Sequence, residues 1–146
     1  MPALWRPTPR QSIAAECERR GNAAVVAGCI DLLHGRQDTD DALLIALAGP
    51  AAEAVLDGSA GSGEGYWPRV WAARGLLHAW DDSATEAIIH ATHDAAWRVR
   101  EMAGKVVARH RVGDALDAVA ALRDDPVPRV RAAAQRAVVI LTAGAV

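Results

Sequence analysis

The chain has 146 residues, of which 51% are hydrophobic and 23% are charged, and its formal net charge is −2. This length fits one domain with its own core, and the composition excludes a disordered or low-complexity chain. Residues 1–65 carry five Arg against nine carboxylates, a net of −4, whereas residues 66–146 carry 11 Lys and Arg against nine carboxylates, a net of +2. A nucleic-acid binder usually has a clustered basic face, so this mild asymmetry argues against nucleic acid as the partner.

The start of the chain lacks the apolar stretch of a secretory leader, and its two cysteines are Cys17 and Cys29. We therefore expect a reducing, cytoplasmic location. The apolar run at 138–141 is far shorter than the roughly 20 residues that span a bilayer, which predicts a protein without a membrane segment.

The first part of the chain, residues 1–57, is expected to be helical, because Ala and Leu are abundant and favour helix over strand. Gly21 and Asn22 form a pair that tolerates the left-handed conformation found after a helix. Thr39 or Asp40 is suited to cap the third helix. The predicted helices cover residues 11–20, 23–33, 41–48 and 50–56.

A Gly-rich stretch, residues 58–65, follows and predicts a flexible loop. It lacks the Lys-Ser or Lys-Thr pair of a phosphate-binding loop, so nucleotide binding has no support here. The stretch divides the first helical part from residues 66–146.

Five helices are predicted in residues 66–146 from the spacing of apolar positions and from capping residues. They cover about 68–80, then 83–93 with Ser83 as the cap, a stretch from near Trp97 to before Val112, then 115–123 with Asp114 as the cap, and 128–142. Short turns separate them, so this part consists of successive helix pairs.

A short pattern occurs twice among these helices. Asp94 precedes Val99-Arg100 and Ala103, and Asp125 precedes Val130-Arg131 and Ala134. The separation of Val99 from Val130 is called here the repeat interval. A weaker copy begins at Val70, whose separation from Val99 is two residues less than the repeat interval. In this copy Val70-Trp71 stands in place of the Val-Arg pair, and Arg74 stands in place of the Ala. Self-similarity with a period of about 30 residues indicates an array of structural repeats.

These residues resemble the short HEAT repeats of the phycobilisome-lyase type, which carry an Asp before the first helix, a Val-Arg pair at its start and small residues one turn later. The resemblance implies an all-α fold, a right-handed α-α superhelix (a HEAT-like α-solenoid) of about nine helices, including shorter N-terminal ones. It predicts repeats at 67–93 and 97–124 and a half repeat at 128–142, with residues 1–57 packing on the array. It also implies that the Asp and Arg of the pattern link neighbouring turns by charge-assisted hydrogen bonds.

The last predicted helix carries Val130, Ala134, Val138 and Leu141 on one side and has no partner helix after it. Two interpretations stay open. Either the half repeat caps the array, or another molecule, such as a second copy in a homodimer formed through this C-terminal helix, covers the surface behind Leu141.

The first repeat carries aromatic and cationic residues on one helical face, namely Trp67, Trp71, Arg74 and His78, at i, i+4, i+7 and i+11. Such a face could stack on a side chain of a partner or on a base. We favour the alternative, in which it packs against the acidic N-terminal half, because bulky aromatic residues at helical spacing usually belong to the core.

The second helix of that repeat places Glu86, His90 and His93 on one face. A carboxylate and two imidazoles could form an open metal site, but the equivalent face of the next repeat, with Asp117 and Asp124, adds no matching imidazole. Neither an HExxH motif nor the His-Glu pairs of HEAT-like iron hydroxylases occur. We therefore predict no metal, no cofactor and no catalytic residue, and interpret the face as polar and solvated.

Repeat arrays present an extended concave surface, which suits recognition better than catalysis. The leading hypothesis is a non-enzymatic scaffold that binds a protein or peptide with its inner helices. Its groove would carry Glu86, His90, His93, Asp117 and Asp124, with Trp97 at the edge.

Two alternatives from other classes stay open. One is a HEAT-like enzyme, either a lyase or a metal-dependent enzyme, that encloses a small molecule with one of the two faces above. The other is a DNA-binding, glycosylase-like protein whose basic face consists of Arg98, Lys105, Arg109, Arg129 and Arg136.

Overall fold

The computed structural model describes residues 7–36, 40–56 and 65–143. Within these ranges every regular element is a helix and no strand occurs, so the predicted all-α class is confirmed. None of the described helices is both long and apolar enough to cross a bilayer. The predicted loop at 58–65 lies, apart from Gly65, outside the described residues.

The N-terminal part consists of α1 (Pro9–Arg20), α2 (Asn22–Leu33), α3 (Asp41–Ala48), the 3-10 turn η1 (Gly49–Ala51) and α4 (Ala52–Leu56). Helix α1 begins two residues before the predicted start, because Thr8 and Gln11 form a reciprocal capping box around Pro9. Gly21, with φ of 93°, then turns the chain directly into α2.

Asp40 joins the capping of α3 to the packing of α1. Its Oδ1 accepts a hydrogen bond of 2.8 Å from the Leu43 amide, which confirms Asp40 as the cap. Arg20 donates to both carboxylate oxygens, at 2.6 and 2.9 Å. The hydrogen bonds from the Arg20 guanidinium, and to a smaller extent the one from the Leu43 amide, hold the pKa of Asp40 well below its usual range.

The C-terminal part alternates long helices with short ones. The long helices are α5 (Trp67–His78), α7 (Trp97–His110) and α9 (Pro128–Thr142). Between them lie η3 (Asp82–Ala84) with α6 (Thr85–Ala91), and η4 (Gly113–Ala115) with α8 (Leu116–Ala121) and η5 (Leu122–Asp124). Each predicted short helix therefore begins as a 3-10 turn.

The predicted caps of these two short helices are wrong. Asp81 caps η3 by accepting the Ser83 amide at 2.9 Å, so the acceptor lies two residues before Ser83. Asp114 lies inside η4, whose N-terminal neighbour Val112 makes no side-chain cap. An acidic or hydroxyl residue near a helix start predicts the start well, but a 3-10 first turn shifts the capping position.

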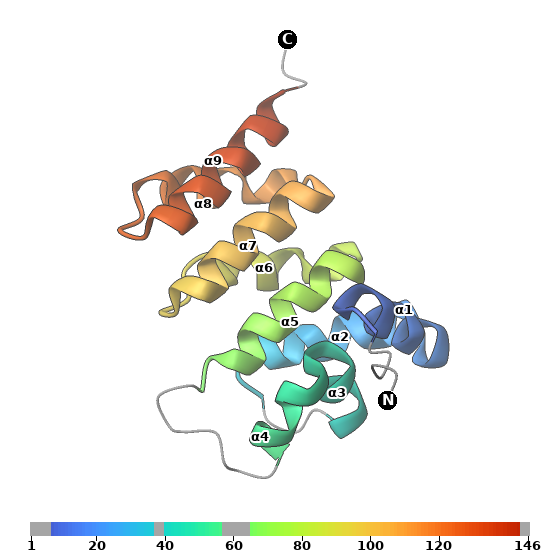
Figure 1. Cartoon of the computed structure of the whole chain (residues 1–146). Helices are drawn as coiled ribbons and strands as arrows, with labels where there is room; N and C mark the ends of the chain where they lie inside the picture. Colours follow the sequence, from blue (N-terminus) through green and yellow to red (C-terminus); the bar gives the residue numbers. More distant parts are fainter. Residues whose placement is uncertain (1–6, 37–39, 57–64, 144–146) are drawn as a thin grey trace, which may run out of the picture.

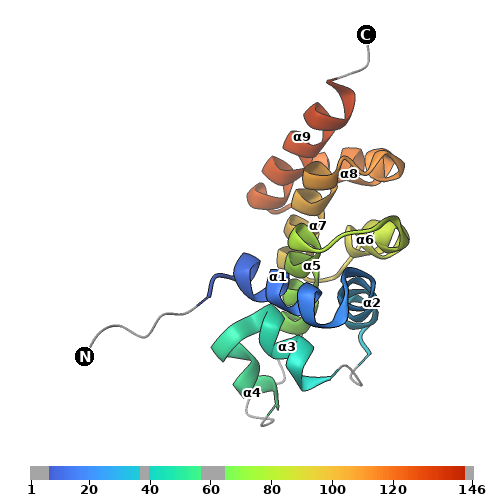
Figure 2. The ribbon, with the colours of Figure 1, turned by 90° about the vertical axis from the view of Figure 1, so that its right-hand side faces the viewer.

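The helices lie in two rows (Figures 1 and 2). The front row consists of α5, α7 and α9, side by side, and the rear row consists of α2, α6 and α8. Helices α1 and α3 pack on α5 in front of it and do not extend over α9. The rows are arranged in line and do not surround a common centre.

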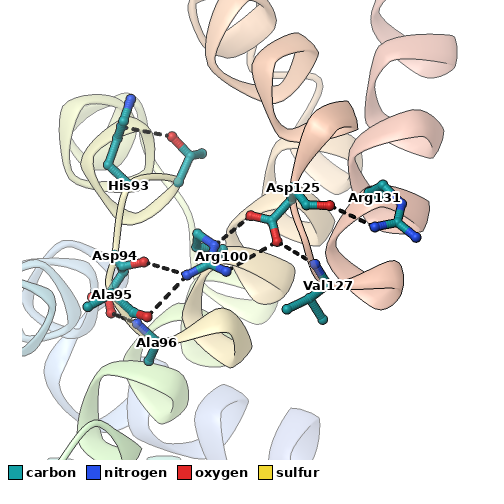
Figure 3. A network of polar contacts seen from close by, with 9 residues as sticks. His93, Asp94, Ala95, Ala96, Arg100, Asp125, Val127 and Arg131 are labelled. Atoms are coloured by element: carbon teal, nitrogen blue, oxygen red, sulfur yellow. Dashed lines mark hydrogen bonds and ion pairs between the residues drawn. The ribbon is translucent and has the colours of Figure 1, made fainter.

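The repeat interval holds throughout the front row, which corrects the predicted alignment of Val70 with Val99. Arg69 donates to Asp94 at 2.8 and 3.2 Å, and Arg100 donates to Asp125 at 2.7 and 3.2 Å. Both pairs have the same separation in sequence and lie between consecutive helix pairs; Figure 3 shows the second. Arg69, and not Trp71, is therefore the first Arg of the pattern.

Close helix packing depends on small residues in this register. Ala72, Ala103 and Ala134, each one repeat interval from the next, are all fully buried. A Cβ on Gly75 would lie 2.5 Å from Leu47 Cδ2 and 3.0 Å from Cys29 Sγ, so α5 approaches α2 and α3 through this glycine. One core runs from Ile13 on α1 to Ala137 on α9, and a small satellite cluster lies between η5 and α9.

Candidate functional site

The predicted groove residues of the rear row are all exposed. Glu86 and His90 lie on α6, His93 lies in the turn after it, Asp117 lies on α8 and Asp124 lies in η5. The repeat interval matches Glu86 with Asp117 and His93 with Asp124. None of these three carboxylates forms an ion pair within the part of the chain that the structure describes.

The two histidines of this surface have different neighbours. The ring of His90 lies 5.9 Å, centroid to centroid, from the ring of His34 at the end of α2. His93 Nδ1 lies 3.1 Å from Thr92 Oγ1 and 3.3 Å from the Ile89 carbonyl oxygen. Among the described residues, no three His, Cys, Asp or Glu side chains converge as metal ligands would.

Trp97 contacts two cations of the front row and the satellite hydrophobic cluster. The Arg98 guanidinium carbon lies 4.5 Å from its ring centroid and that of Arg129 lies 5.2 Å away. The indole also packs against the satellite cluster of Leu122, Val130 and Ala134. The structure thus assigns this side chain to the contact between α7 and α9.

The aromatic and cationic face of α5 is largely covered. Trp71 is only 7% exposed and belongs to the core, and Trp67 stacks on it at 6.5 Å. Arg74 Nη2 donates to the Leu47 carbonyl at 2.6 Å, and burial lowers the pKa of Arg74. His78 is exposed. Arg74 therefore contacts α3 and Trp71 is buried in the core, so neither offers a free surface for stacking.

Positive and negative charges are segregated between the front and rear rows. The comparison of net charge between residues 1–65 and 66–146 did not reveal this segregation. Helices α5, α7 and α9 carry nine Lys and Arg against the single carboxylate of Glu101, a net of +8. The intervening segments 82–91 and 113–124 carry five carboxylates against Arg123, a net of −4. The signs alternate along the sequence with the helices, so any long window averages them. Counting the charges of the long helices separately from those of the segments between them reveals the segregation.

Hollows also occur on the described surface, among them the following two. One, of about 580 Å³, lies where α5 and α7 begin and is lined by Tyr66, Arg69, Trp97 and Arg98, among others. The other, of about 790 Å³, lies between α1 and the α3–η1 segment beside the half-exposed Ile45. Each combines residues from separate helices, so no local sequence pattern predicts it.

The arrangement as a whole offers an acidic rear row, a basic front row and a covered aromatic face. Its exposed polar groups can bind charged partners, and their chemistry is that of ion pairing and hydrogen bonding. Function is inferred from this geometry alone, since no protein-family model matches the chain and the searches of curated proteins and of solved structures found no match.

Proposed function

We propose that this chain is a non-enzymatic HEAT-like repeat module that binds a basic segment of a protein or peptide on the rear row. The observation that carries the proposal is the excess of exposed carboxylates on the α6 and α8 segments that have no ion-pair partner within the described ranges. A partner with Lys and Arg would supply the missing counter-charges.

The repeat assignment is supported by the regular register. The Arg-Asp contact recurs between consecutive helix pairs with the same sequence separation and similar distances. The backbone carbonyls of Asp94 and Asp125 each accept a hydrogen bond from an Arg of the following helix, Arg100 at 2.9 Å and Arg131 at 2.8 Å. A right-handed superhelix is the form that we propose for this row of helix pairs.

The choice of a basic partner rests on like charges at equivalent positions. Glu86 and Asp117 are one repeat interval apart, on helices that follow one another in the rear row. They carry the same charge, and neither has an ion-pair partner among the described residues. A partner cation placed between them would be attracted to both.

We also propose a cytoplasmic location. Cys17 and Cys29 are both free thiols in the structure. Burial, and to a smaller extent Cys17, raises the pKa of Cys29 to about 12. A neutral buried thiol packs as a small apolar side chain, a use of cysteine that suits a reducing compartment.

The test is a selection of short random peptides displayed on phage against the immobilised full chain. We expect the enriched peptides to be rich in Lys and Arg. Their affinity should fall by about tenfold or more, or about 1.4 kcal/mol, when both carboxylates are reversed in the variant Glu86→Lys/Asp117→Lys. Both side chains are exposed, so circular dichroism should show an unchanged fold.

The matched control is Glu18→Lys/Glu53→Lys, which changes the net charge equally at exposed positions of the N-terminal part. It should leave the affinity of the selected peptides unchanged. The proposal fails if no peptide is enriched, or if the two double variants weaken binding to the same extent.

A further inference from the structure

The front row presents a stripe of cations on each of its last two helices. On α7, Arg98, Lys105 and Arg109 stand at i, i+7 and i+11, and on α9, Arg129 and Arg136 stand at i and i+7. These spacings put each set on one side of its helix. The buried residues of α7, such as Val99, Ala103 and Val106, occupy the other positions. The cations therefore point away from the core.

The two stripes are in register. Arg98 and Arg129 are one repeat interval apart and both lie over the ring of Trp97, at 4.5 and 5.2 Å. Glu101, on the same helix as Lys105, accepts from Arg129 at 2.8 Å and lies 4.0 Å from Lys105. This is the only carboxylate on the three front-row helices. Among the residues that the structure describes, Arg98, Arg109 and Arg136 have no ion-pair partner.

The cationic surface continues from α7 towards α1. His78 is exposed at the end of α5. Its pKa is lowered, first by partial desolvation and then by the nearby side chains of Arg10, Arg109, Arg74 and His110. No carboxylate contributes to that shift. The N-terminal helices thus cover α5, and α1 adds the cation Arg10 to those around His78.

We propose that this surface, formed by Arg98, Lys105, Arg109, Arg129 and Arg136 and called here the basic face, binds the phosphate backbone of duplex nucleic acid. Successive cations of one helix lie about 6–10 Å apart along its axis, and the next helix lies about 8–10 Å away. This grid of positive charge is presented on rigid helices. A duplex carries one negative charge per about 1.7 Å of its axis, so several phosphates can lie within reach at once.

Two features favour a duplex over other polyanions, and a third strengthens binding of polyanions in general. Arg98 and Arg129 already lie over the ring of Trp97, which leaves this indole poorly placed to stack on an unpaired base. Among the described residues of α7 and α9, Val139 is the only exposed large hydrophobic side chain, so the basic face lacks the cluster of apolar anchors that centres a protein interface. Apart from Glu101, which pairs with Lys105 and Arg129, the three front-row helices carry no carboxylate, so the overall charge of −2 understates the local positive potential that any polyanion would meet.

The experiment measures fluorescence anisotropy of a labelled DNA duplex of about two helical turns with the full chain, at salt concentrations from about 50 to 200 mM. If the protein contacts three to five phosphates, the logarithm of the association constant should fall against the logarithm of salt concentration with a slope of about −2.7 to −4.5. The variant Arg109→Glu/Arg136→Glu should bind at least about tenfold more weakly at the lowest salt. Both side chains are exposed, so this variant should keep its helix content.

The matched control is Arg36→Glu/Arg123→Glu, which alters the net charge equally at exposed positions of the rear row. It should bind DNA within about threefold of the wild type. It changes the net charge as much as the first variant does, but it removes no cation of the basic face. Equal losses in the two variants, or no saturable binding of the duplex, would overturn the proposal.

Two further measurements separate other occupants of the basic face. An oligoglutamate peptide that binds more tightly than the duplex would identify an acidic protein as the partner and refute the nucleic-acid proposal. Salt-sensitive self-association, weakened both by Arg109→Glu/Arg136→Glu and by Glu86→Lys/Asp117→Lys, would refute it in favour of a second copy docked through its rear row. The variant Glu86→Lys/Asp117→Lys alters the rear row and leaves the basic face unchanged. Duplex binding that persists in this variant therefore supports the basic face, whether or not the rear row binds a basic peptide.

Discussion

Gly75 is the point at which the N-terminal helices come closest to the front row. The Cβ of an Ala there would lie 2.5 Å from Leu47 Cδ2 and 3.0 Å from Cys29 Sγ, both on buried residues. We expect Gly75→Ala to lower the free energy of unfolding by about 1–2 kcal/mol, because overpacking outweighs the gain of up to about 1 kcal/mol in helix propensity. Urea unfolding followed by circular dichroism measures the change.

Gly113 provides the control for this substitution. It begins η4, its φ is not in the left-handed region, and a Cβ there would meet no atom within 4 Å. Gly113→Ala should therefore change the free energy of unfolding by less than about 0.5 kcal/mol. Equal effects at the two positions would show that close packing at Gly75 is not what holds α5 against α2 and α3.

At the scale of elements, the Arg-Asp contacts connect one helix pair to the next. The Asp125 side chain is 5% exposed and accepts from Arg100 and from the Val127 amide, whereas the Asp94 side chain is 12% exposed. We expect Asp125→Asn to lower the free energy of unfolding by about 1.5–3 kcal/mol, since Asn keeps the acceptor for Val127 but loses the charge. Asp94→Asn should cost less, and a larger cost in urea unfolding at Asp94 would contradict this ranking.

The same contact predicts a dependence on pH. The hydrogen bonds from Arg100 are the main cause that lowers the pKa of Asp125. The folded chain therefore binds fewer protons than the unfolded chain in acid. The stabilisation is complete above the unfolded pKa of about 4 and disappears as the pH falls through the lower folded pKa. We expect the difference in stability between the wild type and Asp125→Asn to shrink between pH 7 and about pH 3, and a constant difference would exclude this ion pair as its source.

The positions of most helices could be predicted, because apolar spacing and caps such as Asp40 are local signals. The register of the first repeat could not be predicted. Val70 looks like the Val that begins the Val-Arg pair, but the residue that makes the contact to Asp94 is Arg69. That contact joins two separate helix pairs and depends on packing. The groove residues of the rear row were predicted as an exposed polar face, but the segregation of charge emerges only when helices distant in sequence are placed in rows.

At the scale of the whole molecule, each helix pair contacts its neighbours in the row, and the two ends differ. Helix α5 is enclosed by α2, α3 and α7, with α1 also in contact. Helix α9 contacts α7, α8 and η5, and its last two turns hold Val139, which is 53% exposed. Local stability in such arrays follows the number of neighbours, so the C-terminal end should open most readily.

Hydrogen exchange measured by mass spectrometry tests this gradient. We expect amides of α5 and α7 to exchange only on global unfolding, and amides near the end of α9 to exchange through local fraying with little protection. The measurement also decides between the two interpretations of the last half repeat. Protection of α9 that rises with protein concentration, together with slower exchange around Val139, would mean that a second copy covers this end. Protection independent of concentration would mean that α9 itself caps the row, and the basic face on its front would then be free in the monomer to bind phosphate.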